Sequence, residues 1–332
     1  MSWIADVQAR IERGEQPPDW IAPVLGLASN AQALGMWWRH RQPKFRVEAH
    51  VVSFGNLTAG GTGKTPAVVE RARQEIDAGR RVAVVSRGYL SGKTPEPLVL
   101  EKDSPPVGIA SGFGDELAVI HLRVPEALLI KSADRVAGAA EAVRRGAQVV
   151  LLDDGFQSVR LERDEDVVLL DARHPLSNGH LLPRGLLRER PEALERATEI
   201  WLTRCDLAQD VEAAEQEVRR IVPDARIRKT SHVPDRLHNL AEDTYVPLEF
   251  LKGRRVAAAC GIGDPRAFVK TLEQIGAKVE TTHFAPDHHR LDLSGIPSEL
   301  TVVMTEKDAV KIAAPDTRSY ALGIGLADWD PA

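Results

Sequence analysis

The sequence predicts an α/β fold in which a parallel sheet is covered by helices on both faces, followed by a second, smaller α/β domain. From residue 50 onward, short runs of β-branched and aliphatic residues alternate with helical stretches, which is typical of βαβ units. The first of these runs leads directly into a glycine-rich turn and the start of a helix. The length of 332 residues exceeds the size at which one hydrophobic core keeps growing, so two domains are expected.

Six apolar runs predict the strands of the larger domain. They occupy residues 51–54, 82–86, 127–130, 149–153, 167–171 and 200–203. Because these runs are almost continuously apolar, we expect helices to cover both faces of the sheet.

The organisation of the second half follows from a change in composition after Pro223. The region 228–250 carries prolines at 234 and 247, scattered charges and little periodicity, which is typical of a connector. Beyond it, strands are predicted at 256–260, 279–283 and 302–305, with helices at 265–275 and from Lys307. The predicted parts are therefore an N-terminal segment at 1–46, a first domain at 47–227, a connector at 228–250 and a smaller domain at 251–332.

The composition is that of an ordinary folded enzyme, with 43% hydrophobic, 27% charged and 5% aromatic residues. A net charge of -5 argues against a nucleic-acid scaffold, so no nucleic acid is expected among the partners. No obligate protein partner is indicated either. Cys205 and Cys260 lie far apart and have no paired metal or redox spacing, which predicts free thiols in a reducing cytosol.

The N-terminal segment contains no charged side chain from Ile21 to Trp38. It ends in Trp37 and Trp38, and a basic run follows, made of Arg39, His40, Arg41, Lys44 and Arg46. Paired tryptophans followed by basic residues are typical of a membrane interface. Acidic residues at 6, 12 and 15 fall where an export signal would have to lie, so we expect that the chain is not exported.

Two interpretations of this segment remain open. Leu27, Ala31, Leu34 and Trp38 recur on one helical face, which favours a helix lying in the plane of the interface. Polar residues at 29, 30 and 32 make the segment polar for a span, so a peripheral helix is favoured over one that anchors the protein by spanning the membrane. The alternative is a helix packed on its own domain.

A phosphate-binding loop is predicted between the first strand and the first helix of the larger domain. Glycines let successive backbone N–H groups point at phosphate oxygens, and the helix dipole favours an anion there. Lys64 would contact the β- and γ-phosphates, and the Thr65 hydroxyl would bind Mg²⁺. The residues expected to bind ATP here are Asn56, Thr58, Gly60, Gly61, Thr62, Gly63, Lys64 and Thr65.

This loop departs from the usual spacing, because Thr58 occupies the place of the first glycine. The glycine pair at 60 and 61 resembles the loop of the ATPases related to MinD and ParA. Those proteins have a signature lysine where this chain has Ala59, so their dimer-dependent chemistry is not expected here.

Two acids at the end of a buried strand, Asp153 and Asp154, complete the predicted site. Either carboxylate would bind the magnesium ion, and the other would orient water or a substrate hydroxyl. The fold is therefore predicted to be of the P-loop NTPase type. Thr203-Arg204-Cys205-Asp206 resembles a guanine-reading motif, but arginine replaces its lysine, so ATP is favoured over GTP.

The acceptor side depends on Asp115, which opens a helix after Gly114. An N-cap is the simplest interpretation of this aspartate. In a kinase, the same carboxylate would accept the proton of the acceptor hydroxyl, with His288 of the second domain as its partner.

The chain resembles the tetraacyldisaccharide 4'-kinases, the lipid A kinases, along most of its length. The resemblance includes the loop at 55–66, Ser86-Arg87-Gly88-Tyr89, Gly114-Asp115-Glu116 and Asp153-Asp154-Gly155-Phe156-Gln157. It continues with residues 178–183, Leu187-Arg188-Glu189, Asp287-His288-His289 and Thr305-Glu306-Lys307-Asp308-Ala309.

This resemblance implies transfer of the ATP γ-phosphate to the 4'-hydroxyl of a tetraacylated glucosamine disaccharide 1-phosphate, at the cytoplasmic face of the inner membrane. It implies Asp115 as the base, His288 as its partner and Lys64 as the γ-phosphate clamp. It also implies Thr65 with Asp153 or Asp154 at the magnesium ion. Near the nucleotide it implies Gln157 and Glu189, and near the glycolipid Tyr89, Arg184 and Arg188.

Two other functions remain as alternatives. A MinD/ParA-like ATPase switch would share the glycine pair, but it has no use for Asp115 or His288. A GTPase metallochaperone would need metal-binding clusters, for which His288 and His289 are the only adjacent candidates.

Overall fold

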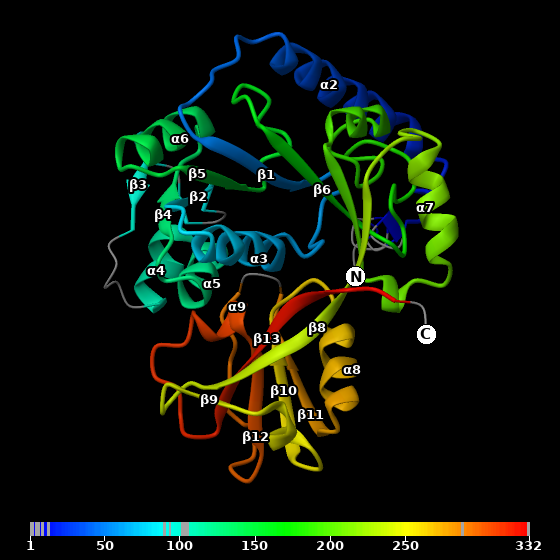
Figure 1. Cartoon of the computed structure of the whole chain (residues 1–332). Coiled ribbons are helices and arrows are strands. Elements are labelled where there is room, and N and C mark those ends of the chain that lie inside the picture. Colours follow the sequence, from blue (N-terminus) through cyan, green and yellow to red (C-terminus); the bar gives the residue numbers. More distant parts are fainter. Residues whose placement is uncertain are drawn as a thin grey trace.

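The computed structural model describes residues 14–88, 91, 92, 94–100, 106–286 and 289–330, together with Trp3, Val7, Arg10 and Ile11. Its strands form one continuous hydrogen-bonded path in the order β11-β10-β12-β13-β8-β7-β6-β1-β5-β2-β4-β3, with β9 paired to β8. Figure 1 shows the two halves of this path as an upper and a lower part of the molecule.

The upper part is a mainly parallel sheet with β1 near its centre. The six strands predicted for it are confirmed: β1 (His50–Asn56), β2 (Val82–Ser86), β4 (Leu128–Lys131), β5 (Val149–Asp153), β6 (Glu165–Asp171) and β7 (Glu199–Thr203). β1 lies between β5 and β6 and is parallel to both. At one edge of the sheet, β3 (Leu98–Val99) is antiparallel to its neighbour β4.

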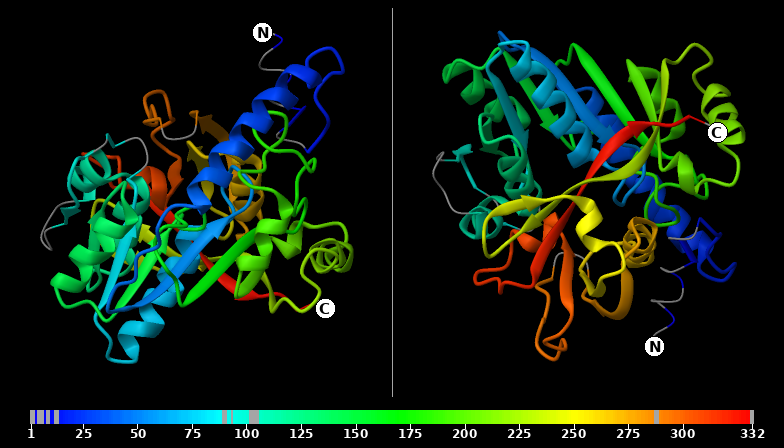
Figure 2. Two further views of the ribbon diagram at one scale, coloured as in Figure 1. Left: turned by 90° about the horizontal axis from the view of Figure 1, so that it is seen from above. Right: turned by 60° about the horizontal axis from the view of Figure 1, so that its bottom comes forward.

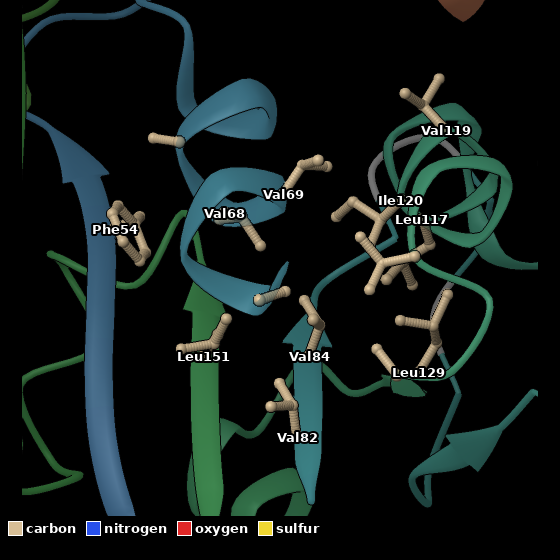
Figure 3. Packing of buried hydrophobic residues seen from close by; sticks show 14 of the residues in the cluster. Phe54, Val68, Val69, Val82, Val84, Leu117, Val119, Ile120, Leu129 and Leu151 are labelled. Atoms are coloured by element: carbon tan, nitrogen blue, oxygen red, sulfur yellow. The ribbon is translucent and has the colours of Figure 1, made fainter. Parts of the chain in front are cut away.

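Helices cover both faces of this sheet, as predicted from the continuous apolar runs. On one face, Phe54, Val84 and Leu151 pack with Val68 of α3 (Lys64–Asp77) and with α5 (Asp115–Arg123), as Figure 3 shows. Residues next to Val84 and Leu151 in the strands, such as Val85 and Val150, belong to a second buried cluster that includes residues of α6 (Arg135–Arg144). The upper part also contains α4 (Pro106–Phe113), α7 (Val211–Arg219), η1 (Pro191–Arg196) and η2 (Cys205–Leu207).

Two long strands join the upper and lower parts. β8 (Ile227–Asn239) pairs in parallel with β7 of the upper sheet and antiparallel with β13 (Ser319–Asp328) along most of its length. The rest of the lower part consists of β9 (Thr244–Val246), η3 (Leu248–Leu251), β10 (Arg255–Cys260), α8 (Pro265–Ile275), β11 (Lys278–Phe284), β12 (Thr301–Thr305) and α9 (Glu306–Ala309). Figure 1 shows β8 and β13 crossing from one part to the other.

These two strands are where the structure adds most to the sequence. Region 228–250 was expected to be a connector of little periodicity, yet most of it is strand. β13 was not predicted, because Gly323 and Gly325 interrupt its apolar pattern; Gly323 lies against Arg236 and Gly325 against Asp235. The proposed domain boundaries remain predictions.

The helix α2 (Ala22–His40) lies along the outside of the upper part, as Figure 1 and the left view of Figure 2 show. Among the residues that the structure describes, no helix is long and apolar enough to cross a membrane. Cys205 and Cys260 are buried free thiols, as predicted.

Candidate active site

The glycine-rich loop folds between the end of β1 and the start of α3. Gly60 and Gly63 have φ angles of 115° and 87°, a region that favours glycine. The side-chain amide of Asn56 donates to the carbonyl of Gly60 at 3.0 Å, which fixes the loop from within. α3 begins at Lys64 immediately after Gly63, so the first N–H groups of this helix follow the loop, as phosphate binding requires.

Other residues hold the loop from outside. The N–H of Ala59 donates to the carbonyl of Leu186 at 2.7 Å, and the Thr203 hydroxyl donates to the carbonyl of Thr62 at 3.1 Å. A side chain at position 63 would collide with the ring of His232 on β8. Burial, together with Arg204, lowers the pKa of His232 to about 4, so this ring is neutral at physiological pH.

The acid pair predicted at the end of β5 lies beside Lys64. The Lys64 Nζ is 3.6 Å from Oδ1 of Asp154, and Arg188 donates to the same carboxylate at 2.7 Å. Burial opposes the ionisation of Asp154, but Lys64 and Arg188 outweigh it and lower its pKa to about 2. Asp154 also has a φ of 54°, which turns it away from the strand direction.

Asp153 has a different environment, although it is adjacent in the chain. Its side chain is buried and accepts a hydrogen bond from the Ser86 hydroxyl at 3.1 Å, while Arg135 donates to its backbone carbonyl at 3.1 Å. Burial raises the pKa of Asp153, and Lys64 acts against this. A divalent cation would remove the cost of burying this charge, so the residues present fit a magnesium ion.

Gln157 and Glu189 lie together beneath the start of the loop. The Gln157 amide donates to the carbonyl of Asn56 at 3.1 Å and to Glu189 at 3.3 Å. Glu189 also contacts Arg196 and, at 3.0 Å, His40 of α2. Because Asn56 fixes the loop, this group links α2 to the phosphate-binding loop.

Asp115 begins α5 and is buried. Its Oδ2 lies 3.8 Å from the Nζ of Lys307 and 3.9 Å from that of Lys311, both from the lower part of the molecule. Burial, helped by Asp153, raises the pKa of the adjacent Glu116 to about 7, and Lys307 acts against this. Asp115, Glu116 and Asp153 therefore form one electrostatically linked group.

The structure describes some of the remaining predicted site residues and not others. Tyr89 and His288 lie outside the described residues. Arg184 lines a hollow of about 610 Å³ between α2 and the segment 179–192. A second hollow of about 620 Å³ lies beside it, lined by Leu34, Trp37, Arg188 and others.

The structure also brings in residues to which the sequence assigned no role. Arg135, Lys311 and His232 are scattered through the chain in ordinary local patterns. Lys307 stood within a motif that carried the family resemblance, which was the one available signal. Among the described residues, no group of three or more His, Cys, Asp or Glu side chains is arranged to hold a metal ion.

The site combines a parallel sheet, a glycine-rich loop that ends at Lys64, and an acid pair at the end of β5, the strand beside β1. These features define a P-loop phosphotransferase. The family model of tetraacyldisaccharide-1-P 4'-kinase matches residues 21–327. The chain belongs to this family, which confirms the resemblance and favours a kinase over a MinD/ParA-like switch.

Individual relatives agree with the family model. The chain is 41% identical over 283 residues to the tetraacyldisaccharide 4'-kinase of Anaeromyxobacter dehalogenans (strain 2CP-C), which covers 81% of this chain and 74% of that protein. It is 40% identical over 288 residues to that of Syntrophus aciditrophicus, covering 81% and 76%. The crystal structure of LpxK from Aquifex aeolicus in complex with ATP has a TM-score of 0.74 at 26% identity, covering 92% of this chain and 95% of that one.

Proposed function

We propose that this protein transfers the γ-phosphate of ATP to the 4'-hydroxyl of a tetraacylated glucosamine disaccharide 1-phosphate, a step in lipid A biosynthesis. The observation that carries the proposal is the meeting of Lys64 and Asp154 at the phosphate-binding loop, 3.6 Å apart, in a chain of this kinase family. The names of the relatives support the acceptor, and the Aquifex aeolicus complex supports ATP as the donor.

The nucleotide side of the reaction is assigned to the loop and the acid pair. Backbone N–H groups from Gly60 to Thr65 would bind the phosphates, with Lys64 at the γ-phosphate. Thr65 with Asp153 or Asp154 would hold Mg²⁺, which neutralises charge on the phosphates when it is bound. Asn56, Gln157 and Glu189 support the loop from below, and the positive charge of Arg188 beside Asp154 suits a phosphate.

The acceptor side of the reaction is assigned to Asp115. The sugar oxygen forms a bond to the γ-phosphorus while the bond from phosphorus to the bridging oxygen breaks and ADP leaves. The hydroxyl proton passes to the Asp115 carboxylate. The proximity of Glu116 to Asp153 and Lys64 supports a base close to the phosphate-transfer site. His288 is proposed as the partner of Asp115, and Tyr89 and Arg184 as contacts of the glycolipid.

We place the enzyme at the inner face of the cytoplasmic membrane through α2. This helix turns polar groups inward: Ser29 donates to the carbonyl of Leu181 at 2.8 Å, and Gln32 donates to that of Arg188 at 2.9 Å. Its apolar residues Leu27, Leu34 and Trp38 are exposed, at 73%, 65% and 60%. An exposed apolar face beside a basic run supports a helix lying in the interface more than a helix that is fully packed on its own domain.

Transfer can be measured with γ-labelled ATP, magnesium and the acylated disaccharide 1-phosphate. Label in the lipid, together with ATP turnover that depends on the acceptor, is expected. ATP hydrolysis without any acceptor dependence would instead favour the switch-type ATPase.

Membrane docking can be measured separately by sedimentation with vesicles that contain anionic lipid. Leu27→Ser with Leu34→Ser is expected to weaken vesicle binding about tenfold or more, because two exposed aliphatic side chains lose their burial in lipid. Leu98→Ser, at an exposed position far from α2 in the chain, is the matched control. Equal binding by both variants would count against the role of α2.

A further inference from the structure

The segment 305–311 of the lower part contacts both ends of α5. Glu306 accepts two hydrogen bonds from the Nε of Arg123, at 2.8 and 3.0 Å, near the C-terminal end of the helix. At the N-terminal end, Lys307 and Lys311 lie 3.8 and 3.9 Å from Oδ2 of Asp115. Figure 1 shows α9 next to α5 where the two parts of the molecule meet.

The Arg123 contact fixes how α9 sits on α5. The Arg123 side chain is only 4% exposed and also binds Asp235 of β8, at 2.6 and 3.0 Å. A buried arginine with bidentate contacts to two carboxylates has little freedom to move, since any displacement leaves charges unpaired away from water. The distance between the lysines and Asp115 is therefore set by a rigid junction.

Lys311 is also fixed from within its own part of the molecule. Its Nζ lies 3.1 Å from Oδ1 of Asp308, whose side chain is fully buried. Asp308 in turn accepts hydrogen bonds from the N–H of Gly261 at 3.0 Å and from the Thr305 hydroxyl at 2.6 Å. The ammonium group thus has its position before any substrate binds.

Two other carboxylates belong to the surroundings of Asp115. Glu116 follows it on α5, and Asp153 lies close enough to Glu116 to raise the pKa of that residue. Two cations of the upper part lie nearby, but both already serve the acid pair: Lys64 contacts Asp154, and Arg135 donates to the backbone carbonyl of Asp153. The two lysines of the lower part add positive charge beside this group of carboxylates.

We propose that Lys307 and Lys311 are positioning residues for the general base, and that the second unit thereby supplies part of the catalytic site. Their ammonium groups hold the Asp115 carboxylate in place and offset the negative charge around it. At 3.8 and 3.9 Å they act as neighbouring charges and not as close hydrogen-bond donors, so the carboxylate still accepts the proton of the acceptor. This inference rests on the proposed role of Asp115, and it gives the motif at 305–309 a chemical function.

The test uses the full chain and the lipid-transfer assay, with Lys307→Met, Lys311→Met and the double variant. Methionine keeps the length of the side chain but removes its charge. Each single variant is expected to lower kcat about tenfold and the double variant about a hundredfold, a part of what general-base catalysis contributes. The acidic limb of the pH–rate profile should move to higher pH, and the KM for ATP should stay within about twofold of the parent.

Two further variants act as controls. Lys270→Met, at an exposed position on α8, should leave kcat and the pH profile unchanged. Lys307→Arg and Lys311→Arg should recover most of the activity, since arginine keeps the positive charge.

Three results would overturn the inference. These are a kcat close to that of the parent, a rise in the KM for ATP at constant kcat, or a loss of activity with a lower melting temperature and an unmoved pH profile. The last two would make the lysines phosphate ligands or structural residues. A parent that transfers no phosphate would instead refute the proposed function itself, and an active Asp115→Asn variant would refute the role of Asp115 on which this inference rests.

Discussion

The phosphate-binding loop and the junction between α5 and α9 are built in different ways. The loop is one continuous segment from Gly55 to Thr65, and its main internal bond joins Asn56 to Gly60, four residues apart. The junction joins Arg123 to Glu306, which are 183 residues apart in the chain. Binding of the nucleotide thus depends on local conformation, whereas the charge around the base depends on how two distant parts meet.

The sharpest way to separate the two regions is to remove the base while the loop stays intact. Asp115→Asn is expected to lower kcat for lipid phosphorylation roughly a hundred- to ten-thousand-fold, because an amide cannot accept the proton. Binding of ATP, followed by calorimetry, should be retained, since the loop is untouched. Asp77→Asn, at an exposed position on α3, should have parental activity.

The junction itself can be broken at Arg123. Arg123→Met should lower the free energy of unfolding by about 3–5 kcal/mol, because it leaves Glu306 and Asp235 without their buried partner. Denaturant unfolding measures this change. The matched control is Arg144→Met, which removes an exposed arginine that also has bidentate contacts to a glutamate and should have little effect on stability, because exposed ion pairs contribute little. Similar losses in both variants would show that burial of the junction contributes nothing.

His232 connects the two regions, because β8 carries it to the loop at Gly63. Its pKa is lowered to about 4 in the folded protein from an ordinary value of 6.5. The neutral form is therefore favoured on folding, so this contribution to stability is complete above pH 6.5 and is lost as the pH falls towards 4.

His232→Gln should remove that part of the acid sensitivity. Between pH 7 and pH 4, the free energy of unfolding of the variant should fall by about 2 kcal/mol less than that of the parent. Thermal melts across this range provide the measurement. Parallel curves for the two proteins would mean that His232 is not held neutral by its surroundings.

The smallest expected effect belongs to a purely local feature. Asp134 caps α6 by accepting from the N–H of Val136 at 2.9 Å. Asp134→Ala should lower the free energy of unfolding by about 1 kcal/mol without changing kcat, and Asp134→Asn should keep most of the stability. A change in kcat would mean that local stability on the far face of the sheet affects the junction.

Most strands of the upper sheet could be predicted from the sequence, because their burial leaves a clear pattern in it. Strands such as β2 and β5 are continuous apolar runs, and burial on both faces of a parallel sheet demands such runs. β13 was missed because its glycines break the pattern, and it is held by a long antiparallel pairing with β8 that no local window contains.

Within the site too, features that depend on local sequence could be predicted and features that depend on long-range packing could not. Lys64 and the acid pair were found from their position after strands. In contrast, the contact of Arg188 with Asp154 joins residues 34 positions apart through the packing of a loop against the sheet. The direction in which α2 points its apolar face could not be decided either, because a helix with an uncharged segment fits both interpretations until its polar contacts are known.

The sequence by itself determined the class of protein and the nucleotide site, since a phosphate-binding loop depends on the conformations of consecutive residues and on the order of strand, turn and helix. The tertiary structure alone decided that the two lysines of the segment after β12 lie beside Asp115, and that the loop abuts His232 of β8. These contacts depend on the order of strands in the sheet and on the buried junction at Arg123. Neither the strand order nor the buried junction is determined by residues that are adjacent in the chain.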